Sequence, residues 1–159
     1  MDKLIKLLSR NSEYSVSELS LMLGEPEDYV RARIKKYEDD GIIKGYRALV
    51  NYEKVQDAGV TAYIELKVTP QKKSGFDEIA KRIMAFDEVE SVYLMAGAYD
   101  LSIIVKGETI QEVSAFVSRK LSALDGILST ATHFILKRYK DDGVVLEDED
   151  NSDERCMNY

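Results

Sequence analysis

Four basic side chains lie close together in the stretch GEPEDYVRARIKK, residues 24–36, where they suit contacts with DNA phosphates. They are Arg31, Arg33, Lys35 and Lys36. Acids precede them, and carboxylates repel phosphate. Such acids can accept hydrogen bonds only from base donors such as cytosine N4, so Glu27 and Asp28 are candidate base contacts. The stretch therefore predicts either a helix that reads DNA or the outer face of a small helical domain.

A helix over these residues also explains the acids locally. Pro26 suits the first helical position, so the acids around it lie in the first turn. The helix dipole favours negative charge there by about 0.3–1 kcal/mol for each acid. Val30, Ile34 and Tyr37 recur at helical spacing and form the expected buried side. Gly41 ends the helix.

A shorter helix precedes this one and must hold it in place. Ser15 and Glu18 form a capping box, and the helix that they begin ends at Gly24. Leucines near the N-terminus predict another helix over residues 4–8. A helix, a glycine turn and a second helix make a helix-turn-helix, winged or plain, with an extended segment over 42–50.

From residue 60 the hydrophobic pattern changes to a period of two, which is typical of a half-buried strand. Apolar residues at helical spacing then alternate with further strand patterns. The predicted order is strand 60–68, helix 76–86, strands 90–96 and 99–106, helix 110–124 and strand 128–139. The fold class is therefore α+β, with a ferredoxin-like βαββαβ domain after the helix-turn-helix.

Two helices can cover only one face of such a sheet. The other face should carry side chains too apolar to be fully exposed to water, and we expect it to associate with another copy. The alternative is a face with scattered, exposed apolar residues. The expected residues are Tyr63, Glu65, Tyr93, Met95, Ser102 and Ile104.

The negative charge is concentrated at the C-terminus. Residues 141–159 carry eight acids and one base, which accounts for the whole net charge of −7 and leaves the rest of the chain neutral. The overall acidity therefore does not exclude nucleic acid as a partner of the body. The tail is predicted to be disordered after about Leu146 and to serve solubility or to compete for basic surface.

Little else in the chain suggests catalysis. His133 is the only histidine and Cys156 the only cysteine, so a nucleophilic triad or a Cys-based metal site is not expected. There is no glycine-rich phosphate loop and no calcium loop. No apolar run approaches a membrane span, and the N-terminus lacks a signal-peptide pattern. We expect a cytoplasmic protein without cofactor, metal or membrane partner.

Three segments together resemble the Lrp/AsnC, or feast/famine, regulators. They are DDGIIKGYRALVNYEKV, MAGAYDLSIIV and LSTATHFILKRY, and the resemblance covers about residues 4–146. It implies a transcription factor that binds double-stranded DNA through its N-terminal domain. It also implies a homodimer, often assembled into octamers, whose C-terminal domain senses an amino acid or a similar metabolite at contacts between dimers.

The resemblance also implies an effector site, at the residues Met95, Gly97, Tyr99 and Asp100, with Thr130 and Thr132 from a neighbouring subunit. An α-amino acid presents an ammonium, which the Asp100 carboxylate can bind, and a carboxylate, which backbone N–H groups and a hydroxyl can bind. Glycine lets the ligand approach closely. The alternative is a simple hairpin turn in which Asp100 satisfies its own backbone.

One departure from the family keeps other interpretations open. Family members more often carry Ser-Pro where this chain has Glu25-Pro26, with small hydroxyl residues after it. The acids favour weak or unusual DNA binding, so a stand-alone effector-binding or assembly protein with a decayed DNA-binding domain is one alternative. An enzyme similar to sirohaem decarboxylases is another, resting on His133 and scattered arginines.

The predicted organisation has four parts. Residues 1–50 form the helix-turn-helix domain, 51–59 the linker, 60–140 the ferredoxin-like domain for effector binding and oligomerisation, and 141–159 the acidic tail. We predict a sequence-specific DNA-binding regulator that is not an enzyme.

Overall fold

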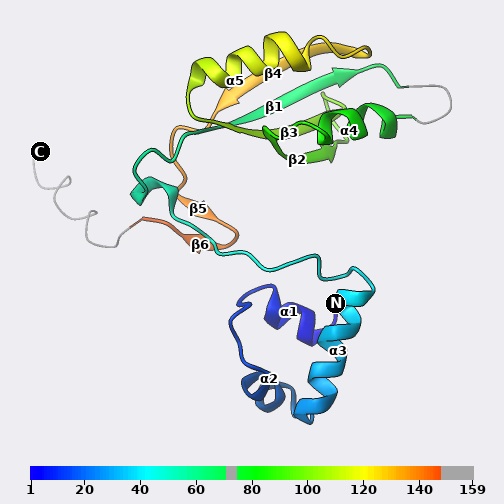
Figure 1. The fold of residues 1–159 in the computed structure, drawn as a ribbon, viewed down its shortest axis with the longest axis vertical. Helices are drawn as coiled ribbons and strands as arrows, with labels where there is room; N and C mark the ends of the chain where they lie inside the picture. The colour runs from blue at the N-terminus through cyan, green and yellow to red at the C-terminus, as the bar shows by residue number, and fades with distance from the viewer. Residues whose placement is uncertain (71–74, 148–159) are drawn as a thin grey trace, which may run out of the picture. The chain divides into compact units, whose positions relative to one another are not determined.

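The computed structural model describes residues 1–70 and 75–147. The chain divides into two compact units, Met1–Val50 and the residues from Asn51 on (Figure 1). Cys156 and most of the acidic tail lie outside the described residues.

The first unit holds three helices, α1 (Lys3–Leu8), α2 (Val16–Leu23) and α3 (Glu27–Asp39). Each helix contributes one fully buried side chain to a small core, and these are Leu4, Leu19 and Val30. Such a core buries little apolar area, so helix caps and ion pairs matter for this unit.

The caps of the helix-turn-helix follow the sequence closely. The capping box of α2 is present: the Ser15 hydroxyl accepts from the Glu18 N–H, and Glu18 accepts from the Ser15 N–H. Gly24 ends α2 with a φ of 69°, a left-handed conformation that glycine adopts without strain. Pro26 is the N-cap of α3 rather than its first helical residue, so α3 begins one residue later than expected. Residues 44–50 after α3 form no regular element.

The second unit is a four-stranded antiparallel sheet with two helices on one face (Figure 1). Its elements are β1 (Val60–Val68), α4 (Asp77–Met84), β2 (Val89–Leu94), β3 (Leu101–Gly107), α5 (Ile110–Phe116) and β4 (Ile127–Phe134). The strand order is β2-β3-β1-β4. This is the predicted βαββαβ arrangement.

The core of this unit lies between the sheet and its two helices. Buried apolar residues occupy every second position along β1 and β3, and the helices add apolar side chains from their inner faces. A π-helical segment, η2 (Val117–Leu121), continues α5, and the two together cover most of the helix predicted over 110–124. The fully enclosed members include Ile64, Leu66, Ile83, Leu101, Ile103 and Leu121.

The C-terminal part of the second unit differs from the prediction. The last strand of the sheet ends at Phe134, not near residue 139. A small hairpin follows, β5 (Lys140–Asp141) and β6 (Val144–Val145), so the tail predicted from residue 141 begins inside an ordered element. Asp142 and Gly143 form its turn with positive φ angles of 43° and 86°.

The predicted linker packs against this second unit. Its short 3₁₀ helix, η1 (Tyr52–Lys54), places the Tyr52 ring near Lys106 Nζ, 4.5 Å from the ring centroid, and near the Arg138 guanidinium at 5.8 Å. The Asn51 side-chain amide donates to the Leu146 carbonyl at 3.0 Å. The start and the end of the described unit are therefore joined.

Candidate functional site

The outer side of α3 presents most of the side chains predicted to contact DNA. Glu27, Asp28, Arg31, Lys35 and Lys36 are all exposed. Lys35 lies 3.8 Å from Asp39 one turn later, an exposed pair of the kind that contributes little to stability. Ala32 is also exposed and leaves space on the helix surface. The exposed surface of α3 therefore carries both signs of charge.

Arg33 is placed differently from the other candidates. Its guanidinium contacts Glu25 Oε2 at 2.5 Å and Asp2 Oδ2 at 2.7 Å, and its side chain is 18% exposed. Asp2 is the N-cap of α1, and Glu25 lies in the turn before α3. Arg33 thus joins three parts of the unit. Because its partner Asp2 is 31 residues away in the sequence, helical spacing alone could not reveal that Arg33 forms these ion pairs.

Asp2 is held in its charged form. Burial opposes the charge of its carboxylate, but hydrogen bonds from the Ile5 and Leu4 N–H groups, together with the Arg33 charge, outweigh burial and lower the pKa of Asp2. The Asp2 carboxylate therefore has two roles: it caps α1 and it pairs with Arg33 of α3.

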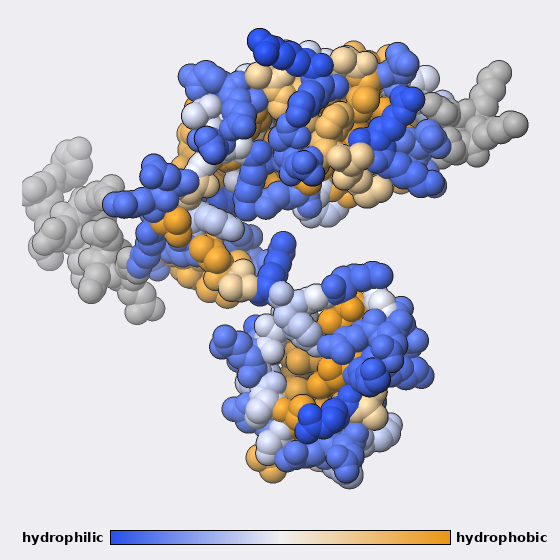
Figure 2. All heavy atoms as spheres, viewed as in Figure 1, coloured by the Kyte–Doolittle hydropathy of each residue, from blue (hydrophilic) through white to orange (hydrophobic). Residues whose placement is uncertain are grey.

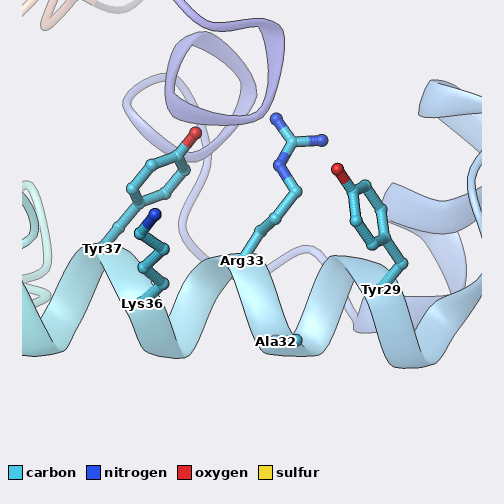
Figure 3. A pocket seen from close by; sticks show the side chains of 5 residues that line it. All are labelled: Tyr29, Ala32, Arg33, Lys36 and Tyr37. Atoms are coloured by element: carbon cyan, nitrogen blue, oxygen red, sulfur yellow. The ribbon is translucent and has the colours of Figure 1, made fainter.

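A hollow of about 420 Å³ lies along α3 (Figure 3). The lining side chains all come from one stripe of this helix: Tyr29, Ala32, Arg33, Lys36 and Tyr37. In Figure 3 the Arg33 side chain extends between the Tyr29 and Tyr37 rings, and its guanidinium is 5.6 Å from the centroid of the Tyr29 ring. Tyr29 was absent from the predicted set, although its spacing of seven residues from Lys36 places both on one side of the helix.

The predicted effector turn joins the ends of three strands. The Met95 N–H donates to the Asp100 carbonyl at 2.8 Å, and the Asp100 N–H donates to the Leu66 carbonyl at 3.0 Å. Asp100 Oδ2 accepts from the Val68 N–H at 2.9 Å, next to a bulge in β1. One carboxylate oxygen therefore accepts from the backbone of β1 rather than from the backbone of its own turn, and Oδ1 makes no hydrogen bond within the described residues.

The glycine in this turn is not required by the chain itself. Gly97 has no left-handed φ, and a Cβ added to it would meet nothing within 4 Å. Met95 and Gly97 are exposed, while Tyr99 and Asp100 are half-buried. The turn thus exposes backbone beside a carboxylate.

The two predicted threonines lie apart from this turn within one chain. Thr130 pairs with Leu66, and Thr132 with Ile64, so both lie on the helix-covered side of the sheet. On the other edge of β1, Leu101 of β3 pairs with Leu66. Leu101 is therefore two strand spacings, or about 10 Å, from Thr130 of β4. The structure of one chain does not bring the threonines and Asp100 into one site.

The helix-free face of the sheet carries five of the six residues expected there, while Met95 follows the last residue of β2. The strand pairing aligns Tyr63 with Ile104 and His133, and aligns Ser102 with Glu65 and Tyr93. His133 Nε2 lies 3.3 Å from Glu65 Oε2. Ser102 is 1% exposed, and its hydroxyl has no hydrogen-bond partner within the described residues.

Apolar side chains are also exposed near the C-terminal hairpin. Figure 2 shows apolar colouring around β5 and β6, where Val144 and Val145 are exposed. None of the helices in the described part of the chain has the length and apolar character to cross a bilayer. Within residues 1–70 and 75–147, no group of three or more His, Cys, Asp or Glu side chains could hold a metal ion.

Comparison with known proteins matches both units. Residues 3–44 match the family model of the winged helix-turn-helix DNA-binding domain, and residues 61–145 match that of the Lrp/AsnC ligand binding domain. The chain is 47% identical over 150 residues to YugG of Bacillus subtilis, an uncharacterized HTH-type transcriptional regulator, covering 94% of this chain and 90% of that protein.

Solved structures agree with these matches. The regulator NMB0573 of Neisseria meningitidis, solved as its L-Met complex, is 26% identical, covers 89% of this chain and 93% of its own, and has a TM-score of 0.70. AsnC of Escherichia coli, 24% identical, has a TM-score of 0.66 over 87% of this chain and 93% of its own, which supports the fold.

A winged helix-turn-helix followed by an antiparallel α+β ligand-binding domain defines a DNA-binding transcriptional regulator. The chain belongs to the Lrp/AsnC family. The names of the family and of the relatives are those of regulators, not of enzymes, so neither the decarboxylase-like enzyme nor the protein with a decayed DNA-binding domain is favoured.

Proposed function

We propose that this regulator binds a pseudo-palindromic DNA site through α3, as a homodimer or a higher homo-oligomer such as an octamer, and that an amino acid tunes the binding. Two-fold pairing of two chains would present two recognition helices to successive major-groove segments. We also propose that it works in the cytoplasm, since a regulator acts where its DNA lies.

The DNA contacts proposed for α3 combine both signs of charge. Arg31, Lys35 and Lys36 are exposed and can neutralise phosphates. Glu27 and Asp28 lie in the first turn, from which a recognition helix contacts base edges, and can accept from cytosine N4. The acids then act as specificity elements that disfavour other bases.

The exposed glycine turn is the observation that best supports amino-acid sensing. Neither φ nor packing within the described residues requires a glycine at position 97, and the missing side chain leaves room for another molecule to approach closely. Asp100 Oδ1 is available for an ammonium group, and the Neisseria meningitidis relative was solved with L-Met. We propose a site formed by Met95, Gly97, Tyr99 and Asp100, completed by Thr130 and Thr132 of another chain.

The helix-free sheet face supports self-association. Tyr63, Tyr93 and Ile104 give it an apolar surface that a single chain leaves without a covering layer of helices. Effector binding at contacts between dimers would change the assembly only through different affinity for two states.

A thermal-shift screen of the twenty amino acids tests the sensing proposal, because a ligand that binds only the native state raises Tm. Asp100→Asn then separates charge from structure: its amide oxygen can still accept from Val68 N–H, while the negative charge is lost. We expect this variant to keep its Tm without ligand and to lose the ligand-induced shift. An unchanged shift would exclude Asp100 as the ammonium partner.

Footprinting on DNA selected from a random pool tests the DNA proposal. We expect a protected, roughly two-fold symmetric site whose affinity falls steeply as salt rises. A protein that selects no duplex even at low salt would contradict it.

A further inference from the structure

We propose that Arg33 is a positioning residue that fixes the recognition helix from inside the protein, and that Lys36, two turns after Tyr29, makes the phosphate contact on the same stripe of α3. This division of labour rests on the proposed DNA binding by α3.

Arg33 is committed to two carboxylates from outside its own helix. One is Asp2, which caps α1, and the other is Glu25, in the turn that leads into α3. One terminal nitrogen of the Arg33 guanidinium donates to both carboxylate oxygens of Asp2, at 2.7 and 2.8 Å. The other terminal nitrogen donates to the Glu25 carboxylate. A planar fork that bridges two carboxylates fixes the direction of α3 relative to α1 and to the turn.

The same contacts make Arg33 a poor partner for DNA. Asp2 and Glu25 occupy both terminal nitrogens of the guanidinium, so a phosphate would have to use the remaining N–H donors or displace one carboxylate. In either case a carboxylate would lie close to the phosphate, and like charges repel. The aromatic ring of Tyr29 further covers one side of the guanidinium, 5.6 Å from its centroid.

Lys36 has the opposite character. It lines the hollow (Figure 3), it is exposed, and it makes no ion pair within the described residues. Tyr29 lies two turns earlier on the same stripe and is 55% exposed. Ala32 between them is small, so a DNA backbone can approach the helix there. An ammonium and a phenol beside an open surface suit a phosphate oxygen.

The salt dependence of DNA binding separates the two roles. The probes are a duplex selected from a random pool by the parent protein and a shuffled duplex of the same length. For Lys36→Gln we expect weaker binding to both duplexes and a salt slope reduced by about 0.9, the loss of one phosphate contact. For Arg33→Gln we expect an unchanged slope and a preference for the selected duplex that falls about tenfold, similar to the loss of one base pair's recognition.

Variants of the partner complete the test. If Arg33 acts through Glu25, Glu25→Gln should reduce the preference in the same way, and the double variant Glu25→Gln/Arg33→Gln should lose less than the sum of the single losses. Circular dichroism at the binding temperature checks that each variant is folded. A variant that is less stable but still folded under these conditions should bind DNA with the affinity of the parent.

The outcomes are distinct. A slope lowered by about 0.9 in Arg33→Gln, or an unaltered preference in that variant, would overturn the positioning role. An unaltered slope in Lys36→Gln would overturn the phosphate contact. A parent protein that selects no duplex would overturn the proposed DNA binding itself, and this inference with it.

Discussion

Two buried hydroxyls on the helix-free face of the sheet have opposite surroundings. Thr61 Oγ1 accepts a hydrogen bond from the Arg138 guanidinium at 2.7 Å, whereas the Ser102 hydroxyl has no partner within the described residues. A buried polar group without a hydrogen-bond partner destabilises the folded state, whereas a hydrogen bond from a charged donor stabilises it. The two residues therefore form a natural matched pair.

We expect Ser102→Ala to leave the free energy of unfolding unchanged or to raise it. Thr61→Val keeps a similar shape but leaves the Arg138 guanidinium without its acceptor, so it should lower that free energy by about 1–3 kcal/mol. Urea unfolding of the full chain measures both. A clear loss of stability in Ser102→Ala would indicate a partner for this hydroxyl, in the assembled protein or in bound water.

Residue types alone predicted part of the site. Exposure of Arg31, Lys35 and Lys36 follows from their spacing against Val30 and Ile34, which the sequence shows directly. The role of Arg33 could not be predicted in this way, because its partner Asp2 is distant in sequence and reaches it only when the three helices pack. The one signal in the sequence for this role is that Arg33 lies near the edge of the buried side of its helix.

At the scale of elements, two glycines have opposite reasons. Gly59 precedes β1 with a φ of +72°, and a Cβ there would lie 2.5 Å from the Gly107 carbonyl oxygen. At Gly97 a Cβ would meet nothing within 4 Å. One glycine is required by the fold, and the other is available for function.

We expect Gly59→Ala to lower the free energy of unfolding by about 1–3 kcal/mol, from backbone strain and from crowding against the Gly107 backbone. Gly97→Ala should leave that free energy unchanged and weaken the binding of any amino acid found in the thermal-shift screen. Chemical unfolding and ligand titration of both variants test the contrast. Equal stability losses in the two variants would contradict it.

The capping box of α2 predicts a dependence on pH. The hydrogen bond from the Ser15 hydroxyl, and then that from the Ser15 N–H, lower the pKa of Glu18 below its ordinary 4.5. A carboxyl whose pKa is lower in the folded state stabilises that state fully above the unfolded pKa, and this contribution is lost as pH falls through the folded pKa.

The helical NMR signals of α2 in the full chain should therefore weaken as pH falls below about 4.5, and less so in Glu18→Gln. Glu13→Gln is the control, since the Glu13 carboxylate makes no contact within the described residues. An identical pH response in Glu18→Gln and the parent would rule out the capping box as the cause.

Most elements were predictable because their periodicity is strong, as in β1, where buried apolar residues recur at every second position from Ala62 to Val68. The hairpin of β5 and β6 was missed because two-residue strands give no periodic signal and lie within an acidic stretch. The Asp142-Gly143 pair was the available clue, since Asp-Gly favours tight hairpin turns. The end of β4 was misjudged because apolar residues continue after Phe134, where the strand ends. The Ile135 N–H still donates to the Thr61 carbonyl of β1 at 2.9 Å, but Ile135 and Leu136 are not part of the strand.

At the scale of the molecule, the helix-free sheet face determines what we expect of the assembly. Tyr93 is 49% exposed on this face, while Met84 is 58% exposed on α4, on the other side of the sheet. The two side chains are similarly accessible but belong to opposite surfaces of the same unit.

If this face is the proposed contact between copies, a charge placed on it should dissociate the proposed oligomer, because burying an unpaired carboxylate in an interface is costly. We expect Tyr93→Glu to shift the chain towards monomer and Met84→Glu to leave its mass unchanged, with sedimentation equilibrium as the measurement. If both variants sediment like the parent, the helix-free face is not the contact between copies.

The hydrogen bond between the Asn51 side chain and the Leu146 carbonyl has a practical consequence. The chain enters and leaves the ligand-binding unit at one place, and units with adjacent ends tolerate transplantation into loops of other proteins. The segment from Asn51 to Leu146 is therefore a suitable insert for a biosensor, in which a host enzyme would report binding at the proposed glycine-turn site without any DNA.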